Sequence, residues 1–173
     1  MPKRAGLRPP FPMTADTSVI EVTLESDLSE VEVADEITRR VSTTAGFDED
    51  DQQKIEMAVH ESVINAIFHG NKNDETKRVF LRFQIHPDRL EIHIRDQGAG
   101  FNVDTVADPL ANENLLKVSG RGIFLIRAFM DDLRVDVRPG KGTEVTMTKK
   151  LNANLKPYQG GTDREHEGHN TTN

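Results

Sequence analysis

The sequence predicts an α+β fold in which helices form one layer on a mixed, mostly antiparallel β-sheet. Segments 18–24, 79–94 and 133–147 alternate apolar and polar residues with the period of two that half-buried strands show. Segments 28–45 and 49–70 instead repeat apolar residues at intervals of three and four, as amphipathic helices do. Packing the apolar helix faces on the apolar sheet face gives a two-layer sandwich.

The first half of the folded region is predicted to contain one strand and two helices. The strand covers 18–24. Asp27 or Ser29 can cap the helix that follows, and this helix continues until Gly46. The second helix runs to about Gly70, which we expect to supply the left-handed residue that ends it.

The second half is predicted to contain two hairpins, a long loop and a short helix. The hairpins span 79–94 and 133–147, each around a turn containing proline. The loop 97–121 is too long for a simple connection, and it is therefore either functional or mobile. A helix at 123–130 follows it.

Composition limits the domain count and the partners. The chain has 173 residues, of which 35% are hydrophobic and 29% charged, which is typical of one globular domain. Residues 17–151 are expected to form that domain. Residues 1–16 are rich in proline and charge and 152–173 have almost no apolar residues, so neither end offsets its ordering entropy by burial, and both are expected to be disordered tails. A net charge of −7 argues against a nucleic-acid surface and favours protein or small-molecule partners.

The absence of cysteine and of long apolar segments indicates in which cellular compartment the protein is expected. With no Cys, the chain has no disulfides or thiolate chemistry, which fits a reducing cytoplasm. No window approaches 18 apolar residues, and no apolar leader segment is present, so we expect neither a membrane span nor secretion. A cytoplasmic protein is the resulting expectation.

The second helix carries two polar residues, Glu61 and Asn65, one turn apart on the same face. Apolar residues occupy much of the remaining circumference, so both polar side chains are expected to be partly buried. Burying a carboxylate without a partner is costly, which implies a metal, a ligand or a hydrogen-bond network. The alternative is an ordinary helix with one solvated polar stripe.

A zinc-protease motif is not supported. His60 and Glu61 begin the pattern HExxH, but its second histidine would fall at position 64, which is Ile64. His69 lies nine residues after His60 and projects to the opposite side of the helix. We expect His69 to lie near the helix end instead.

Glycine pairs follow the third strand and precede the last helix. Gly98 and Gly100 come directly after Asp96, and glycine there allows positive φ and close approach to a ligand; a plain turn is the equally weighted alternative. Gly120 and Gly122 flank Arg121 just before a helix, where free amide groups bind anions such as phosphate. Neither pair extends to GxGxxG, and no GxxxxGK[ST] exists, so Rossmann and P-loop sites are excluded.

Four motifs together resemble those of the GHKL ATPase superfamily, whose fold is the Bergerat ATP-binding fold. Glu61–Gly70 resembles the N box, Asp96–Gly100 the G1 box, Gly120–Gly122 the G2 box and Gly140–Thr143 the closing GxGT. Taken alone, the last of these would be a hairpin turn. The sequence GRGIFLIRAFMDDLRV is particularly similar to small bacterial anti-sigma factor serine kinases of the RsbW type. A sensor histidine kinase would need a phosphoacceptor histidine upstream, and no histidine precedes the helix that carries the N box.

The resemblance implies a role for each site residue. Asn65 would bind Mg²⁺ bridging the phosphates of ATP, Asp96 would accept from the adenine amino group, and Thr143 would support Asp96 through a water. Glu61 matches the general base, and 107–119 would form a lid over ATP. The other residues would contact the nucleotide: Gly98 and Gly100 at the adenine, Gly120, Arg121 and Gly122 at the phosphates, and Lys117 or Arg121 at the γ-phosphate.

Three functions follow from these observations. The first, implied by the resemblance, is an ATP-dependent serine/threonine kinase that phosphorylates an anti-anti-sigma protein, sequesters a sigma factor and forms a homodimer. The second is a non-catalytic ATP-binding module that captures a protein partner. The third is a structural α+β protein whose glycines serve only turns, which would show no ATP-dependent change in melting temperature.

Overall fold

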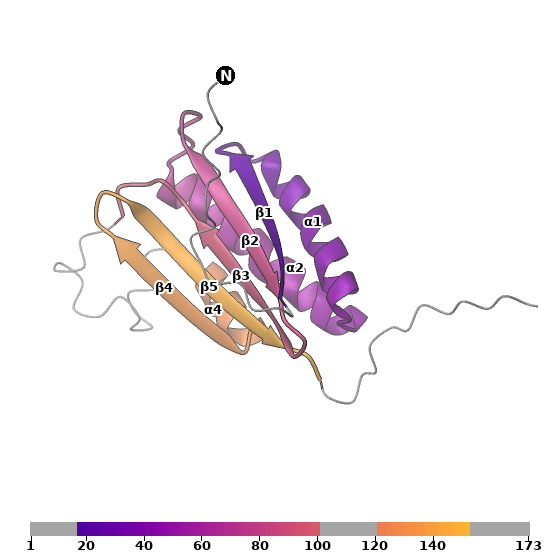
Figure 1. Cartoon of the computed structure of the whole chain (residues 1–173). Coiled ribbons are helices and arrows are strands. Elements are labelled where there is room, and N and C mark those ends of the chain that lie inside the picture. The colour runs from indigo at the N-terminus through magenta and orange to yellow at the C-terminus, as the bar shows by residue number, and fades with distance from the viewer. Residues whose placement is uncertain (1–16, 101–120, 153–173) are drawn as a thin grey trace, which may run out of the picture.

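Residues 17–100 and 121–152 are described by the computed structural model, and they form two layers (Figure 1). In this part of the chain one sheet has the strand order β1-β2-β3-β5-β4, and every neighbouring pair is antiparallel. The two-layer α+β prediction is therefore confirmed. The strands are β1 (Ser18–Glu25), β2 (Arg78–Ile85), β3 (Arg89–Arg95), β4 (Asp132–Arg138) and β5 (Gly142–Lys150). The helices are α1 (Glu30–Ala45), α2 (Glu49–Ile64), the π-helix η1 (Asn65–Gly70) and α4 (Arg121–Phe129).

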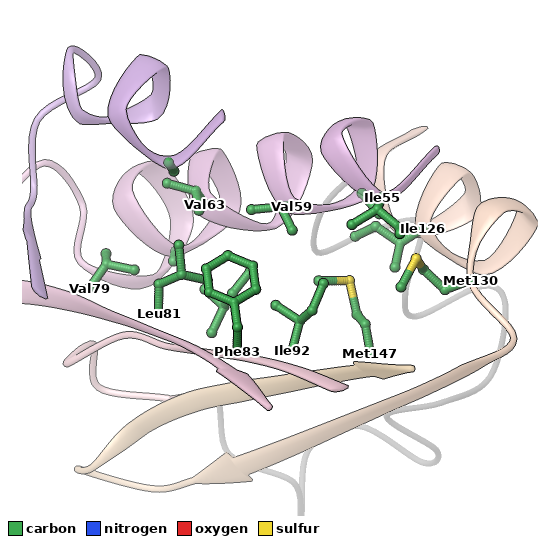
Figure 2. Packing of buried hydrophobic residues seen from close by; sticks show 14 of the residues in the cluster. Ile55, Val59, Val63, Val79, Leu81, Phe83, Ile92, Ile126, Met130 and Met147 are labelled. Carbon is green, nitrogen blue, oxygen red and sulfur yellow. The ribbon is translucent and has the colours of Figure 1, made fainter. Parts of the chain in front are cut away.

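The hydrophobic core lies between the helices and one face of the sheet (Figure 2). Leu81 and Phe83 of β2 project toward Val59 and Val63 of α2, and all four side chains are at most 1% exposed. Ile126 of α4 is equally buried and extends this layer. Each such side chain contributes roughly 1.5–3 kcal/mol through burial. Because this face of α2 is fixed on the sheet, the polar residues of the same helix have fixed directions as well.

The start of α1 differs from the predicted capping. Asp27 Oδ1 accepts at 2.8 Å from the amide of Ser29, which lies before the helix, so Asp27 bonds no residue of α1 itself. The Ser29 side chain makes no capping bond to the helix. Gly46 ends α1 with a φ of 91°, a conformation that glycine adopts without strain. Asp48 caps α2 by accepting from the amide of Asp51 at 2.8 Å.

The end of the second helix differs from the prediction. The helix does continue to Gly70, but from Asn65 it widens into η1, and the amide of Asn71 donates to the carbonyl of Ala66 at 2.8 Å, one residue beyond α-helical spacing. Gly70 is not left-handed, so that expectation was wrong. The chain instead takes positive φ at Lys72 and Asn73 (57° and 54°), after the widened turn.

Several predicted segments lie outside the described residues. These are the tails, apart from Asn152, and the loop from 101 to 120, with the lid expected at 107–119. None of the helices in the described part of the chain combines the length and apolar character needed to cross a membrane.

Candidate functional site

The start of α4 lies directly against the polar face of the second helix. A β-carbon built on Gly122 would lie 2.9 Å from Glu61 Oε2 and 3.2 Å from Asn65 Nδ2. With a side chain at position 122, the end of the Glu61 side chain would have to move. Glu61 and Asn65 are both half-buried, as the sequence predicted, and the structure brings them together with one of the two glycines expected at the phosphates.

Asn65 carries a polar atom without a partner. Its Nδ2 is buried and has no hydrogen bond to any described residue. An unsatisfied buried amide costs roughly 1–3 kcal/mol, so the arrangement is costly unless the side chain has a further purpose. The unpartnered amide lies beside the start of α4, close to Gly122.

Asp96 occupies the second half of the site, where β3 ends beside the start of β5. It is only 5% exposed. Its Oδ1 accepts from the amide of Gly98 at 2.8 Å and from the amide of Thr143 at 3.1 Å. Burial raises the pKa of this carboxyl, while these two backbone amides act in the opposite direction. Thr143 therefore supports Asp96 directly through its backbone.

Glycines surround Asp96 because the backbone passes too close for side chains. A β-carbon on Gly70 would lie 2.3 Å from Asp96 Oδ2, and one on Gly98 would lie 2.2 Å from the carbonyl oxygen of Gly70. A β-carbon on Gly142 would lie 2.1 Å from the carbonyl oxygen of Asp96. Gly98 does not take positive φ, contrary to expectation; glycine is needed there because the backbone of Gly70 lies too close for a side chain. Gly100 does take positive φ, at 65°.

The π-helix η1 connects the two halves of the site. Asn65 is its first residue and Gly70 its last, so Gly122 contacts one end while Asp96 contacts the other. Six helical residues span roughly 7–8 Å between the first and last α-carbons. The buried carboxylate of Asp96 therefore lies at one end of η1 and the start of α4 at the other.

Some predicted site residues lie outside this description. Lys117 and Gly120 precede the described part of α4. Arg121 opens the helix, but its side chain is not among those described.

Sequence reasoning missed two residues that shape the site. Gly142 was placed in the closing GxGT motif without a role of its own, although a β-carbon on it would overlap the carbonyl oxygen of Asp96. Asn71 is fully buried beside Gly70, and its side chain accepts from the amide of Gln97. The position of Asn71 directly after the last glycine of the N box was the feature of the sequence that could have indicated its place beside the site.

The fold and this arrangement define the class of protein. Residues 24–149 match the family described as histidine kinase-like ATPase domain, and the chain belongs to that family. An ATPase domain implies ATP as the ligand, which agrees with a site joining a buried carboxylate to a helix N-terminus.

Individual proteins similar to this chain include anti-sigma factors and serine-protein kinases. The chain is 37% identical over 111 residues to the anti-sigma F factor of Oceanobacillus iheyensis, covering 63% of this chain and 76% of that protein. It is 34% identical over 118 residues to the serine-protein kinase RsbW of Bacillus licheniformis, covering 65% of this chain and 72% of that protein. It is also similar to the histidine kinase domain of the Erythrobacter litoralis EL346 blue-light activated histidine kinase, with a TM-score of 0.48 and 18% identity over 72% of this chain and 60% of that one. The predicted resemblance to GHKL ATPases, and to RsbW-type proteins among them, is confirmed.

Proposed function

We propose that this protein is an ATP-dependent serine/threonine protein kinase that also acts as an anti-sigma factor. The contact of Gly122 with both Glu61 and Asn65 carries the proposal, because it joins a phosphate-binding helix start to a carboxylate and an amide. The names of its relatives, anti-sigma F factor and serine-protein kinase RsbW, support the same pair of activities.

Asp96 is the residue proposed to recognise adenine. Two backbone amides hold Oδ1, so the carboxylate is fixed and Oδ2 remains to accept from the adenine amino group. Gly98 and Gly100 let the backbone pass closely beside Gly70 and Arg138 and so shape the wall proposed to face the base, and Thr143 stabilises Asp96. A rigid acceptor in a buried site discriminates strongly against a base that presents an acceptor of its own.

Asn65 and the start of α4 are proposed to hold the phosphates. The buried amide of Asn65 fits a Mg²⁺ ion, since an amide can present its oxygen and hard cations prefer oxygen ligands. When bound, Mg²⁺ would neutralise phosphate charge. Backbone amides at Gly120, Arg121 and Gly122 would donate to the phosphate oxygens, with Lys117 or Arg121 adding positive charge.

Glu61 is proposed as the general base. In the transfer, the serine or threonine oxygen of the substrate bonds to the γ-phosphorus, the bond to the β-phosphate oxygen breaks, and ADP leaves. The hydroxyl proton passes to the Glu61 carboxylate, which lies beside Gly122 on the phosphate side. Positioning and charge neutralisation supply the rest of the rate enhancement.

The proposed partners are proteins. The kinase substrate would be a STAS-type anti-anti-sigma protein, and the unphosphorylated form of that protein would release a sigma factor from this chain. We propose a cytoplasmic homodimer without direct nucleic-acid or membrane contacts. A non-catalytic module that captures a partner in the ATP-bound state is the alternative.

Substitution of Glu61 by glutamine tests the kinase assignment. Transfer of labelled phosphate from Mg-ATP to a purified STAS-domain protein from the same genome should be abolished in Glu61→Gln, while ATP affinity is kept. Glu56→Gln is the matched control, because Glu56 lies on the same helix but pairs with Arg39 at the surface. Loss of ATP binding in Glu61→Gln would contradict the role as base. ATP binding without any transfer by the unsubstituted protein would favour the non-catalytic module.

A further inference from the structure

Asn71 is the centre of a buried hydrogen-bond network next to the proposed adenine site. The residue is 0% exposed. Its Nδ2 donates to Ser26 Oγ at 2.7 Å and to the carbonyl of Arg78 at 3.0 Å, and its Oδ1 accepts from the amide of Gln97 at 2.8 Å. The side chain thus uses both amide hydrogens and its oxygen.

This network reaches Asp96 from its C-terminal side. Gln97 directly follows Asp96, and its side chain returns a bond by accepting from the amide of Arg78 at 2.7 Å. The amides of three consecutive residues are therefore all engaged: Asp96 with the carbonyl of Thr143, Gln97 with Asn71 and Gly98 with Asp96 itself. With the chain fixed in this way, the Asp96 carboxylate has one orientation.

The same residue also acts on Asp96 through Gly70. Asn71 ends η1 by donating its amide to the carbonyl of Ala66, which fixes the position of the preceding Gly70. The α-carbon of Gly70 lies so close to Asp96 that any β-carbon on it would overlap Oδ2, and the Gly70 carbonyl lies equally close to Gly98. Asn71 therefore fixes the surroundings of the carboxylate on two sides, through its side chain at Gln97 and through its backbone amide next to Gly70.

We infer that Asn71 is a positioning residue that sets the base preference of the nucleotide site by holding Asp96 in a single orientation. This inference rests on the proposed function, in which Asp96 accepts from the adenine amino group. Guanine presents an oxygen acceptor where adenine presents that donor. A carboxylate held against the base repels this oxygen, whereas a carboxylate that can move away from the base repels it less.

The test compares the affinities for Mg-ATP and Mg-GTP in the full-length protein. Asn71→Ala removes the three side-chain hydrogen bonds of Asn71 and keeps its backbone amide, and Asn71→Ser is a milder change that keeps a hydroxyl. Ser26→Ala is the matched control, because it removes one partner of Asn71 from the segment that follows β1 and leaves the bond to Gln97 intact. Each protein is measured at a temperature where circular dichroism shows it to be folded.

We expect the ratio of GTP to ATP dissociation constants to fall at least tenfold in both Asn71 variants. Ser26→Ala should lower the melting temperature while leaving the ratio within twofold of the unsubstituted protein. An unchanged ratio in a folded Asn71 variant would overturn the inference, and so would an equal fall of the ratio in Ser26→Ala. Failure of both Asn71 variants to fold would also overturn it, because the network would then have a purely structural role. Absence of ATP binding by the unsubstituted protein would instead overturn the proposed function.

Discussion

Gly122 and Glu61 lie so close that a single methyl group on the glycine would come within 2.9 Å of the Glu61 carboxylate. This contact joins two segments separated by about sixty positions in the chain. It also places a carboxylate next to the amides at the start of α4, where the proposed phosphates would lie. The geometry of the proposed kinase site depends on this absence of a side chain.

Gly122→Ala should reduce phosphate transfer far more than it reduces stability. The methyl group meets the flexible end of Glu61, which can rotate away, so the fold is kept and the proposed base is displaced. We expect kcat to fall about 10–100-fold, which is a partial loss of the roughly 10²–10⁴-fold that general-base catalysis supplies, with the melting temperature changed by only a few degrees.

Gly46→Ala is the control for this substitution. Gly46 has open space around its α-carbon but a φ of 91°, so alanine there is strained and should lower the melting temperature without affecting transfer. Equal loss of activity in the two variants would argue against a specific role for the Gly122 contact.

Asp96→Asn should abolish the response to ATP without destabilising the free protein. The asparagine Oδ1 can still accept from Gly98 and Thr143, but its NH₂ group would face the adenine amino group. We expect ATP affinity to fall about 100-fold or more, because donor would oppose donor in a buried site. Isothermal titration calorimetry measures this loss, and ATP binding that survives it would exclude Asp96 as the adenine acceptor.

The pH dependence of the same variant follows from the raised pKa of Asp96. Because burial makes the folded-state pKa higher than the unfolded-state value, the folded protein binds the proton more tightly, and Asp96 lowers stability as pH rises through that window. Asp96→Asn removes this cost. Its melting temperature without nucleotide should therefore equal or exceed that of the unsubstituted protein at pH 7, and any advantage should shrink as pH falls toward the ordinary value of 3.8. An advantage that grew on acidification would contradict this sign.

Lys149→Met should be strongly destabilising. Lys149 pairs with Asp51 at 3.2 Å, with side-chain exposures of 11% and 9%, and it donates to the carbonyl of Phe129 at the end of α4. Removing it leaves a buried carboxylate with a weaker partner, Lys54 at 3.6 Å. Urea unfolding should show a loss of about 3 kcal/mol, against about 0.5 kcal/mol or less for the exposed neighbour in Lys150→Met. Similar losses of unfolding free energy at both positions would show that the buried pair of Lys149 and Asp51 contributes no more to stability than an exposed lysine.

Local patterns in the sequence were sufficient to predict most of the fold. Alternation in β2 and β3 predicted the hairpin, and the apolar face of α2 predicted which side would meet the sheet. These signals work because each element has one buried face, so the period of its apolar residues reports its geometry.

The site was only partly predictable, for a physical reason. Glu61 and Asn65 are one helical turn apart, so their shared direction follows from local geometry. The widening at η1 and the pocket contacts of Gly70 and Gly142 depend on how close β3 and β5 pass, and no local pattern records that distance. Asn71 was missed for the same reason, since its partners lie 7 to 45 positions away.

Thermal unfolding with Mg²⁺ alone and with Mg-ATP, in the unsubstituted protein and in Asn65→Ala, tests the nucleotide site most directly. At a ligand concentration 100-fold above Kd, ATP should stabilise the unsubstituted protein by about 2.7 kcal/mol, which is a rise of roughly 5–10 °C for a chain of this size. Asn65→Ala should unfold within a few degrees of the unsubstituted protein without nucleotide, because its Nδ2 has no partner among the described residues, and should show little response to Mg-ATP. An equal response in both proteins would contradict the proposed role of Asn65, and no response in either at millimolar ATP would contradict the nucleotide site itself.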